Sequence, residues 1–117
     1  MAKSYTDIEQ SKKLVEILPL ESADMYYMET SPNNYTIGIL QRMERDMLLN
    51  QSEYYKMFPC WSLVALLDVL PPGKVLLHDK NGLGYKCICN NLDTGFYDNP
   101  VDACFELIVE LNELELL

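Results

Sequence analysis

Apolar residues recur along the chain at two different spacings, and these spacings separate predicted helices from predicted strands. Three segments have the helical period, namely 6–18, 62–70 and 99–114. Two pairs of short segments are rich in strand formers and are joined by turn residues: 23–30 with 35–40, and 74–79 with 83–90. The order helix, hairpin, helix, hairpin, helix predicts a single α+β domain over residues 1–117, in which about three helices cover an antiparallel sheet.

The middle helix carries the strongest signals. Asp68 is the only polar residue of segment 63–70, and the prolines that flank this segment stop a helix because proline lacks an N–H group. Ser62 is the predicted N-cap, and Trp61 and Leu66 have the spacing of a hydrophobic staple. A helix that is apolar nearly all round is expected to be buried, so this one should organise the core.

The first and last helices are marked by their caps. Thr6 and Glu9 have the spacing of a capping box, and Pro19 should stop the helix that they begin. Pro100 suits the first turn of the last helix, directly after Asn99.

The last helix is predicted to be amphipathic. Its carboxylates repeat at intervals of four, four and three residues and therefore form one stripe: Asp102, Glu106, Glu110 and Glu113. Its apolar residues form the opposite face: Cys104, Leu107, Ile108, Leu111 and Leu114. Such a helix is expected to pack against a sheet and to expose the acidic stripe to solvent.

The second hairpin is predicted from the dipeptide Asn81-Gly82 between two apolar runs, a strong signal for a tight turn. A two-residue turn places His78 opposite Tyr85 and Leu76 opposite Cys87. A longer turn shifts this register, and the sequence leaves both registers open.

The segment after the first hairpin stays unassigned. That hairpin turns at 31–34, and the residues 41–58 that follow it give conflicting signals. Arg42 and Asp46 have helical spacing, whereas the pair Tyr54-Tyr55 favours a strand.

Composition is typical of a globular domain, and the sequence leads us to expect a protein of the cytoplasm. It has 117 residues, 49% of them hydrophobic and 23% charged, which is enough for one domain with a core of its own. No apolar run is long enough to span a bilayer, and the N-terminus lacks the apolar stretch of a signal peptide. We therefore expect reduced cysteines that act as small buried residues: Cys60, Cys87, Cys89 and Cys104.

Negative charge dominates and is unevenly distributed. The formal net charge is −9, with −3 in residues 1–58 and −6 in residues 59–117. No lysine or arginine follows Lys86. This argues against direct binding of nucleic acid, which needs clustered basic side chains.

No segment has a recognisable catalytic, cofactor-binding or metal-binding motif. Cys60 precedes a predicted helix, where a thiolate is favoured, but nothing places it near His78, the only histidine. Cys87 and Cys89 lie on one face of a predicted strand without the paired spacing typical of structural zinc sites. The sequence therefore predicts a protein without cofactor or enzymatic activity, and a small Cys/His metal-binding or ligand-binding protein is one alternative.

Two features indicate a protein partner. The acidic stripe can meet a basic surface, and a regular row of carboxylates can also mimic DNA and inhibit a nuclease or a DNA-binding protein. Adjacent tyrosines on a strand point to opposite faces, so one ring of each pair is free for a partner. The candidate partner-binding residues are thus Asp102, Glu106, Glu110, Glu113, Tyr26, Tyr27, Tyr54 and Tyr55.

Four blocks of the chain resemble a group of small proteins encoded in prophage-like and mobile-element regions of gut anaerobes. The blocks are 6–19 (TDIEQSKKLVEILP), 23–25 (ADM), 59–71 (PCWSLVALLDVLP) and 99–112 (NPVDACFELIVELN). They cover somewhat under half of the chain and none of the segment 28–58. The resemblance implies an intracellular accessory protein and transfers no catalytic residue. Together these features lead us to expect a non-enzymatic protein-binding module of a phage or mobile element.

Overall fold

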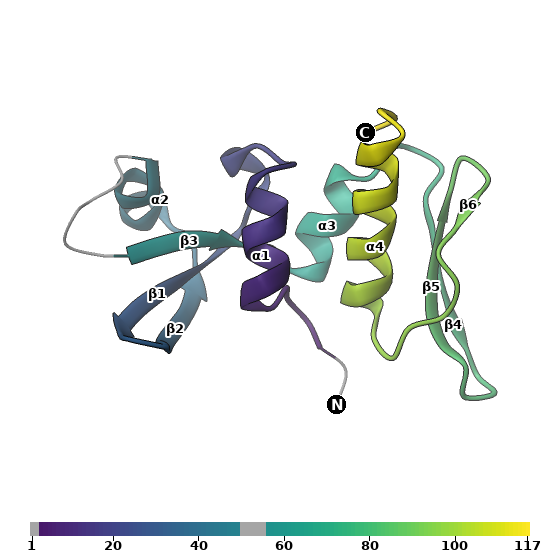
Figure 1. Ribbon diagram of the computed structural model, residues 1–117, viewed down its shortest axis with the longest axis horizontal. Helices are drawn as coiled ribbons and strands as arrows, with labels where there is room; N and C mark the ends of the chain where they lie inside the picture. Colours follow the sequence, from purple (N-terminus) through teal and green to yellow (C-terminus); the bar gives the residue numbers. More distant parts are fainter. Residues whose placement is uncertain (1–2, 50–55) are drawn as a thin grey trace.

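The computed structural model describes residues 3–49 and 56–117 and shows an α+β fold (Figure 1). The elements follow one another as α1 (Ile8–Val15), η1 (Leu20–Ser22), β1 (Met25–Ser31), β2 (Asn34–Ile39), α2 (Arg42–Leu49), β3 (Lys56–Cys60), α3 (Leu63–Val69), β4 (Val75–Asp79), β5 (Gly84–Cys89), β6 (Leu92–Asp93) and α4 (Pro100–Glu113). None of the helices in these described ranges is long and apolar enough to cross a membrane.

The strands form two small antiparallel sheets instead of one, with the orders β2-β1-β3 and β4-β5-β6. Figure 1 shows the sheets at opposite ends of an elongated molecule, with α1, α3 and α4 between them. The predicted α+β class is confirmed, and the predicted order matches except for the additional elements η1, α2, β3 and β6.

The unassigned segment contains a helix and a strand. Residues 42–49 form α2, as the spacing of Arg42 and Asp46 favours, and residues 56–60 form β3 beside β1. Tyr54 and Tyr55 lie outside the described residues.

The second hairpin adopts the register of the shorter turn. His78 lies opposite Tyr85, and Leu76 lies opposite Cys87. The rings of His78 and Tyr85 stack, with their centroids 4.2 Å apart and their planes 5° from parallel. The first hairpin turns near Asn33, which has a φ of 65° and lies in the left-handed region that asparagine tolerates.

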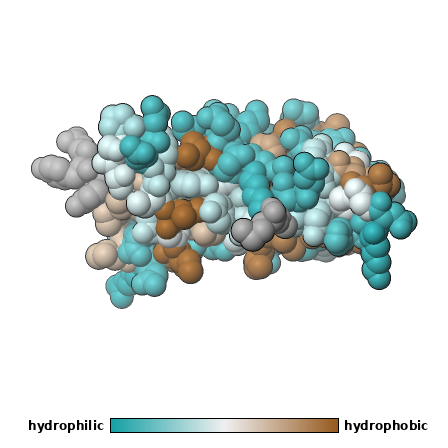
Figure 2. Space-filling view, turned by 90° about the horizontal axis from the view of Figure 1, so that it is seen from below, coloured by the Kyte–Doolittle hydropathy of each residue, from teal (hydrophilic) through white to brown (hydrophobic). Residues whose placement is uncertain are grey.

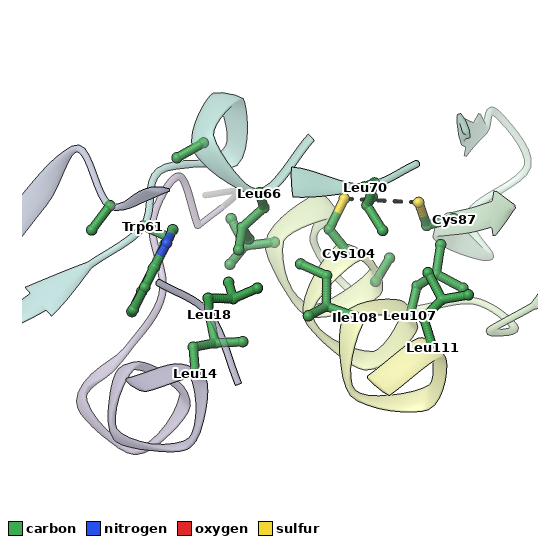
Figure 3. Close-up of a cluster of buried hydrophobic side chains, with 14 of the residues drawn as sticks. Leu14, Leu18, Trp61, Leu66, Leu70, Cys87, Cys104, Leu107, Ile108 and Leu111 are labelled. Atoms are coloured by element: carbon green, nitrogen blue, oxygen red, sulfur yellow. Dashed lines mark hydrogen bonds between the residues drawn. The ribbon is translucent and has the colours of Figure 1, made fainter. Parts of the chain in front are cut away.

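One cluster of buried side chains joins the two ends of the molecule. In Figure 3 it runs from Trp61 past Leu66 and Ile108 to Cys87. Four of the five residues of the predicted apolar face of α4 are fully buried, namely Cys104, Leu107, Ile108 and Leu111. The helix also contributes Val101 and Ala103 to the core, which the prediction did not include. Leu114 is 51% exposed, because the helix ends at Glu113 and the residue falls beyond its packed part.

The structure corrects the prediction that the middle helix is buried all round. Ala65 and Leu66 of α3 are buried against the core, but Val64 is 66% exposed. The reason is that the elements packed against α3, chiefly α4 and η1, leave one stripe at Val64 and Asp68 facing solvent. The predicted N-cap is confirmed, since the Ser62 hydroxyl accepts a hydrogen bond from the Ala65 N–H at 3.2 Å.

The cap of α1 lies one residue later than predicted. Asp7, not Thr6, accepts from the backbone N–H of Gln10, and the Gln10 side chain accepts from the N–H of Asp7. Thr6 is instead fully buried, and its hydroxyl accepts from the backbone N–H of Trp61 at 3.1 Å. The spacing cannot distinguish the two caps, because threonine and aspartate are both good N-cap residues.

Candidate functional site

The acidic stripe borders a groove beside α4. The groove has a volume of about 300 Å³ and is lined by Thr94, Tyr97, Glu106, Val109, Glu110 and Glu113. Three of the four predicted carboxylates therefore meet one hollow of the surface. Opposite them lies the segment that connects β6 to α4.

A glycine in β5 allows this connecting segment to approach the sheet. Tyr97 pairs with Tyr85 through two backbone hydrogen bonds of 2.7 Å each. Gly84 has a φ of +101°, and a Cβ atom on it would lie 2.1 Å from the carbonyl oxygen of Tyr97. Any other residue at position 84 would therefore push away the segment that carries one wall of the groove.

Tyr97 is one of the groove residues that sequence reasoning missed, together with Thr94 and Val109. Its position depends on the pairing of residues 85 and 97, for which the local sequence gives no signal. Partial burial raises the pKa of Tyr97, and the carboxylates of Glu106, Asp102 and Glu110 raise it further. Its phenol is therefore protonated at neutral pH, and the groove combines a neutral hydroxyl with negative charge.

Asp102, the fourth carboxylate of the stripe, is engaged in holding the N-terminal segment. It accepts from Lys3 Nζ at 2.9 Å and from Gln10 Nε2 at 2.8 Å. The side chain of Asn99 donates to its other oxygen at 2.8 Å. These contacts tie α4 to the beginning of the chain, so Asp102 has a structural role.

The contacts of Asp102 predict a dependence of stability on pH. Burial by itself raises the pKa of this carboxyl, but the hydrogen bonds from Lys3, Gln10 and Asn99 outweigh burial and lower it. The ionised group thus stabilises the fold above the unfolded-state pKa of about 3.9, and this contribution is lost as the pH falls through the lower folded-state pKa. Because the side chain is 31% exposed, we expect about 1 kcal/mol or less.

Urea unfolding of the wild type and of Asp102→Asn tests this expectation. The wild type should be the more stable protein at pH 7, and the difference should shrink as the pH is lowered towards 2. A difference that stays constant over this range would contradict the assignment.

The two adjacent tyrosines of β1 lie on opposite faces of the sheet, as the geometry of a strand requires. Tyr27 is only 8% exposed, and its hydroxyl donates to the carbonyl oxygen of Thr6 at 2.8 Å. This removes Tyr27 from the candidate partner surface and assigns it to the core. Tyr26 is half-buried, and its ring lies over Gly38 of β2. Tyr54 and Tyr55, the other candidates, lie outside the described residues.

The cysteines and the histidine do not gather into one site. Within residues 3–49 and 56–117, no three His, Cys, Asp or Glu side chains lie close enough together to hold a metal ion. Cys60 and His78 belong to different sheets. Burial raises the pKa of the Cys60 thiol, so the thiolate that a helix N-terminus favours is not stabilised here.

All four cysteines are buried and unpaired, as expected for small core residues. Cys87 of β5 and Cys104 of α4 meet with their sulfur atoms 3.9 Å apart (Figure 3). The thiol of Cys104 donates to Cys87, which lowers the pKa of Cys87 and raises that of Cys104. This contact joins the last helix to the centre of the second sheet.

Two other hollows have a less distinctive lining. One of about 100 Å³ is lined by Leu20, Glu21, Arg45 and Leu48, and the Arg45 guanidinium there already donates to the carbonyl oxygen of Ala23. The other, of about 340 Å³, has a mainly apolar lining from the segment 17–19 after α1, from α3 and α4, and from Leu117. Of these three hollows, the groove beside α4 is the one in which several charges of one sign converge.

Comparison with known proteins does not assign a function to this groove. Neither the family models, nor the curated proteins, nor the solved structures compared with this chain gave a match.

Proposed function

We propose that the protein is a non-enzymatic binding module whose acidic groove receives a positively charged side chain of a protein partner. The observation that carries this proposal is the convergence of Glu106, Glu110 and Glu113 on one groove. The resemblance of the sequence to proteins of prophages and mobile elements supports the further proposal that this module acts inside a cell, as an accessory protein of such an element.

The lining of the groove suits the side chain of arginine or lysine. A volume of about 300 Å³ lies at the lower end of the range for binding pockets. Carboxylates such as those of Glu106 and Glu110 accept paired hydrogen bonds from a guanidinium group. Val109, between them on the helix, offers an apolar contact to the aliphatic part of the same side chain.

Charge reversal in the groove tests the proposal. The double variant Glu106→Lys/Glu110→Lys should fold normally, because substitutions on a helix surface cost little stability. It should lose at least tenfold in affinity for any basic protein that the wild type retains from a lysate of the host cell. Glu16→Lys/Glu21→Lys is the matched control, since both residues are exposed and the net charge changes equally. Equal binding by the wild type and the groove variant would show that the carboxylates only keep the protein in solution.

Inhibition by DNA mimicry is the second candidate function. The observation in its favour is the absence of any lysine or arginine after Lys86, which leaves the α4 side of the protein without positive charge from its own helix. A mimic should bind a nuclease or a DNA-binding protein in a salt-sensitive manner, and duplex DNA should displace it. A partner that DNA does not displace favours the general binding module instead. The alternative based on cysteine and histidine lacks a cluster among the described residues.

A further inference from the structure

The edge of the first sheet at β2 lacks the features with which proteins protect sheet edges. Four of the described strands lie at a sheet edge: β2, β3, β4 and β6. Natural edges are shielded by charge, proline, short length or a covering element. β3 contains Lys56 and Pro59 and contacts α1 and α2. β4 ends in Asp79 and lies between Lys74 and Lys80, and β6 has only two residues. β2, with the sequence NYTIGI, has no charge and no proline over its six residues.

The hydrogen-bond pattern shows which backbone groups this edge presents. Leu40 continues the register of β2, and its N–H donates to the carbonyl oxygen of Asp24 at 3.0 Å. In an antiparallel pair, residues alternate between those that bond to the neighbouring strand and those that point away from it. Tyr35, Ile37 and Ile39 therefore direct their N–H and C=O groups away from β1, and no described strand pairs with them.

The same three residues present an apolar stripe. Their side chains share the sheet face of Tyr27 and Phe58, which α1 covers over β3 but leaves open over β2. Ile37 is 36% exposed and Ile39 is 69% exposed. The ring of Tyr35 packs at right angles to those of its neighbours on this face, with centroid distances of 6.3 and 5.7 Å. Several separate hydrophobic patches are visible in Figure 2, including on the end of the molecule that holds this sheet.

We propose that β2 pairs antiparallel with the β2 strand of a second copy of this chain, around a two-fold axis at Ile37. Ile37 then lies opposite the partner's Ile37, and Tyr35 lies opposite the partner's Ile39. In each of these pairs, the free backbone N–H and C=O groups of both residues form hydrogen bonds. Each pair also brings together aromatic or β-branched side chains, and such cross-strand pairs stabilise a sheet. The β2-β1-β3 sheets of the two copies thereby join into one sheet of six strands.

Charge favours this edge as the meeting point of two copies. Two chains of net charge −9 repel each other, and the repulsion is weakest where neither chain carries a charged side chain. A strand pair of this length is smaller than the interfaces of about 1,200 Å² or more that hold stable complexes. We therefore expect a reversible dimer whose population rises with protein concentration and with screening by salt.

Sedimentation velocity over a concentration series tests the dimer. The wild type should change from monomer to dimer below about 1 mM. Ile39→Lys should raise the dissociation constant at least tenfold, because it introduces a charge into the paired edge. Val64→Lys is the matched control, since Val64 is 66% exposed on α3, and this variant should dimerise like the wild type. Circular dichroism checks that both variants fold.

Amide hydrogen exchange identifies the paired strand. In the monomer, the amides of Thr36 and Gly38 face β1 and should be protected, whereas those of Ile37 and Ile39 should exchange rapidly. Dimerisation should slow the exchange of Ile37 and Ile39. A wild type that stays monomeric to about 1 mM, an Ile39→Lys variant that dimerises normally, or a dimer in which these two amides still exchange rapidly would each overturn the proposal.

Discussion

Replacing Trp61 by alanine should lower the free energy of unfolding by about 3–5 kcal/mol, the cost of removing a large aromatic side chain from a core. Trp61 is fully buried beside Leu14, Leu18 and Leu66, at the point where the first sheet meets the helices (Figure 3). Its indole N–H also donates to the Ser22 hydroxyl at 2.9 Å. The substitution leaves a cavity in the cluster that joins the two ends of the molecule, so we expect the loss to affect the whole fold.

Urea unfolding followed by circular dichroism measures this effect. Val64→Ala is the control, because Val64 lies three residues further along the chain and is 66% exposed. It should change stability by no more than about 0.5 kcal/mol. Trp61→Phe retains most of the packing and should cost less than the alanine substitution. A loss below about 1 kcal/mol for Trp61→Ala would show that the core does not depend on this residue.

Replacing Thr6 by valine should cost about 2–4 kcal/mol, although the two side chains have nearly the same shape. The Thr6 hydroxyl is fully buried and accepts from the backbone N–H of Trp61. It also lies 2.8 Å from the hydroxyl of Ser11, with which it shares a hydrogen bond. Every buried side-chain nitrogen or oxygen in the described part of the chain has a partner, so this variant would create two unpaired groups in an otherwise satisfied core.

Two further variants test this explanation. Thr30→Val makes the same chemical change at an exposed strand position and should have an effect of about 0.5 kcal/mol or less. The double variant Thr6→Val/Ser11→Ala removes one of the unpaired groups and should recover part of the stability. Equal costs for Thr6→Val and Thr30→Val would mean that the buried hydroxyl contributes nothing beyond its shape.

The bounds of several elements follow from signals that act over a few residues. A capping side chain marks where α3 begins, and a capping side chain followed by Pro100 marks where α4 begins, because each acts on the adjacent turn of backbone. Ser62 and Asn99 are N-caps in the structure, as the sequence predicts. Helical spacing likewise brings Glu106, Glu110 and Glu113 together, since it depends only on the geometry of one helix.

The candidate groove depends on contacts between distant parts of the chain. Tyr97 reaches its wall because residues 85 and 97 pair and because Gly84 leaves room for the approach. Asp102 has the same helical spacing as the other carboxylates, yet it is bound by Lys3, which is distant in the sequence. No pattern within the sequence of α4 distinguishes Asp102, which binds Lys3, from the three glutamates that line the groove.

Local sequence thus predicts elements and their periodic faces, whereas tertiary packing decides which faces are covered. Val64 belongs to the most apolar helix and is nevertheless exposed, because the elements packed against α3 leave the stripe at Val64 and Asp68 uncovered. β3 and β6 become strands by pairing with β1 and β5, and their own short sequences do not require it. The physical reason is the distance along the chain over which each signal acts. Caps, turns and helical spacing act over about four residues, whereas burial and strand pairing depend on segments that meet only in the folded chain.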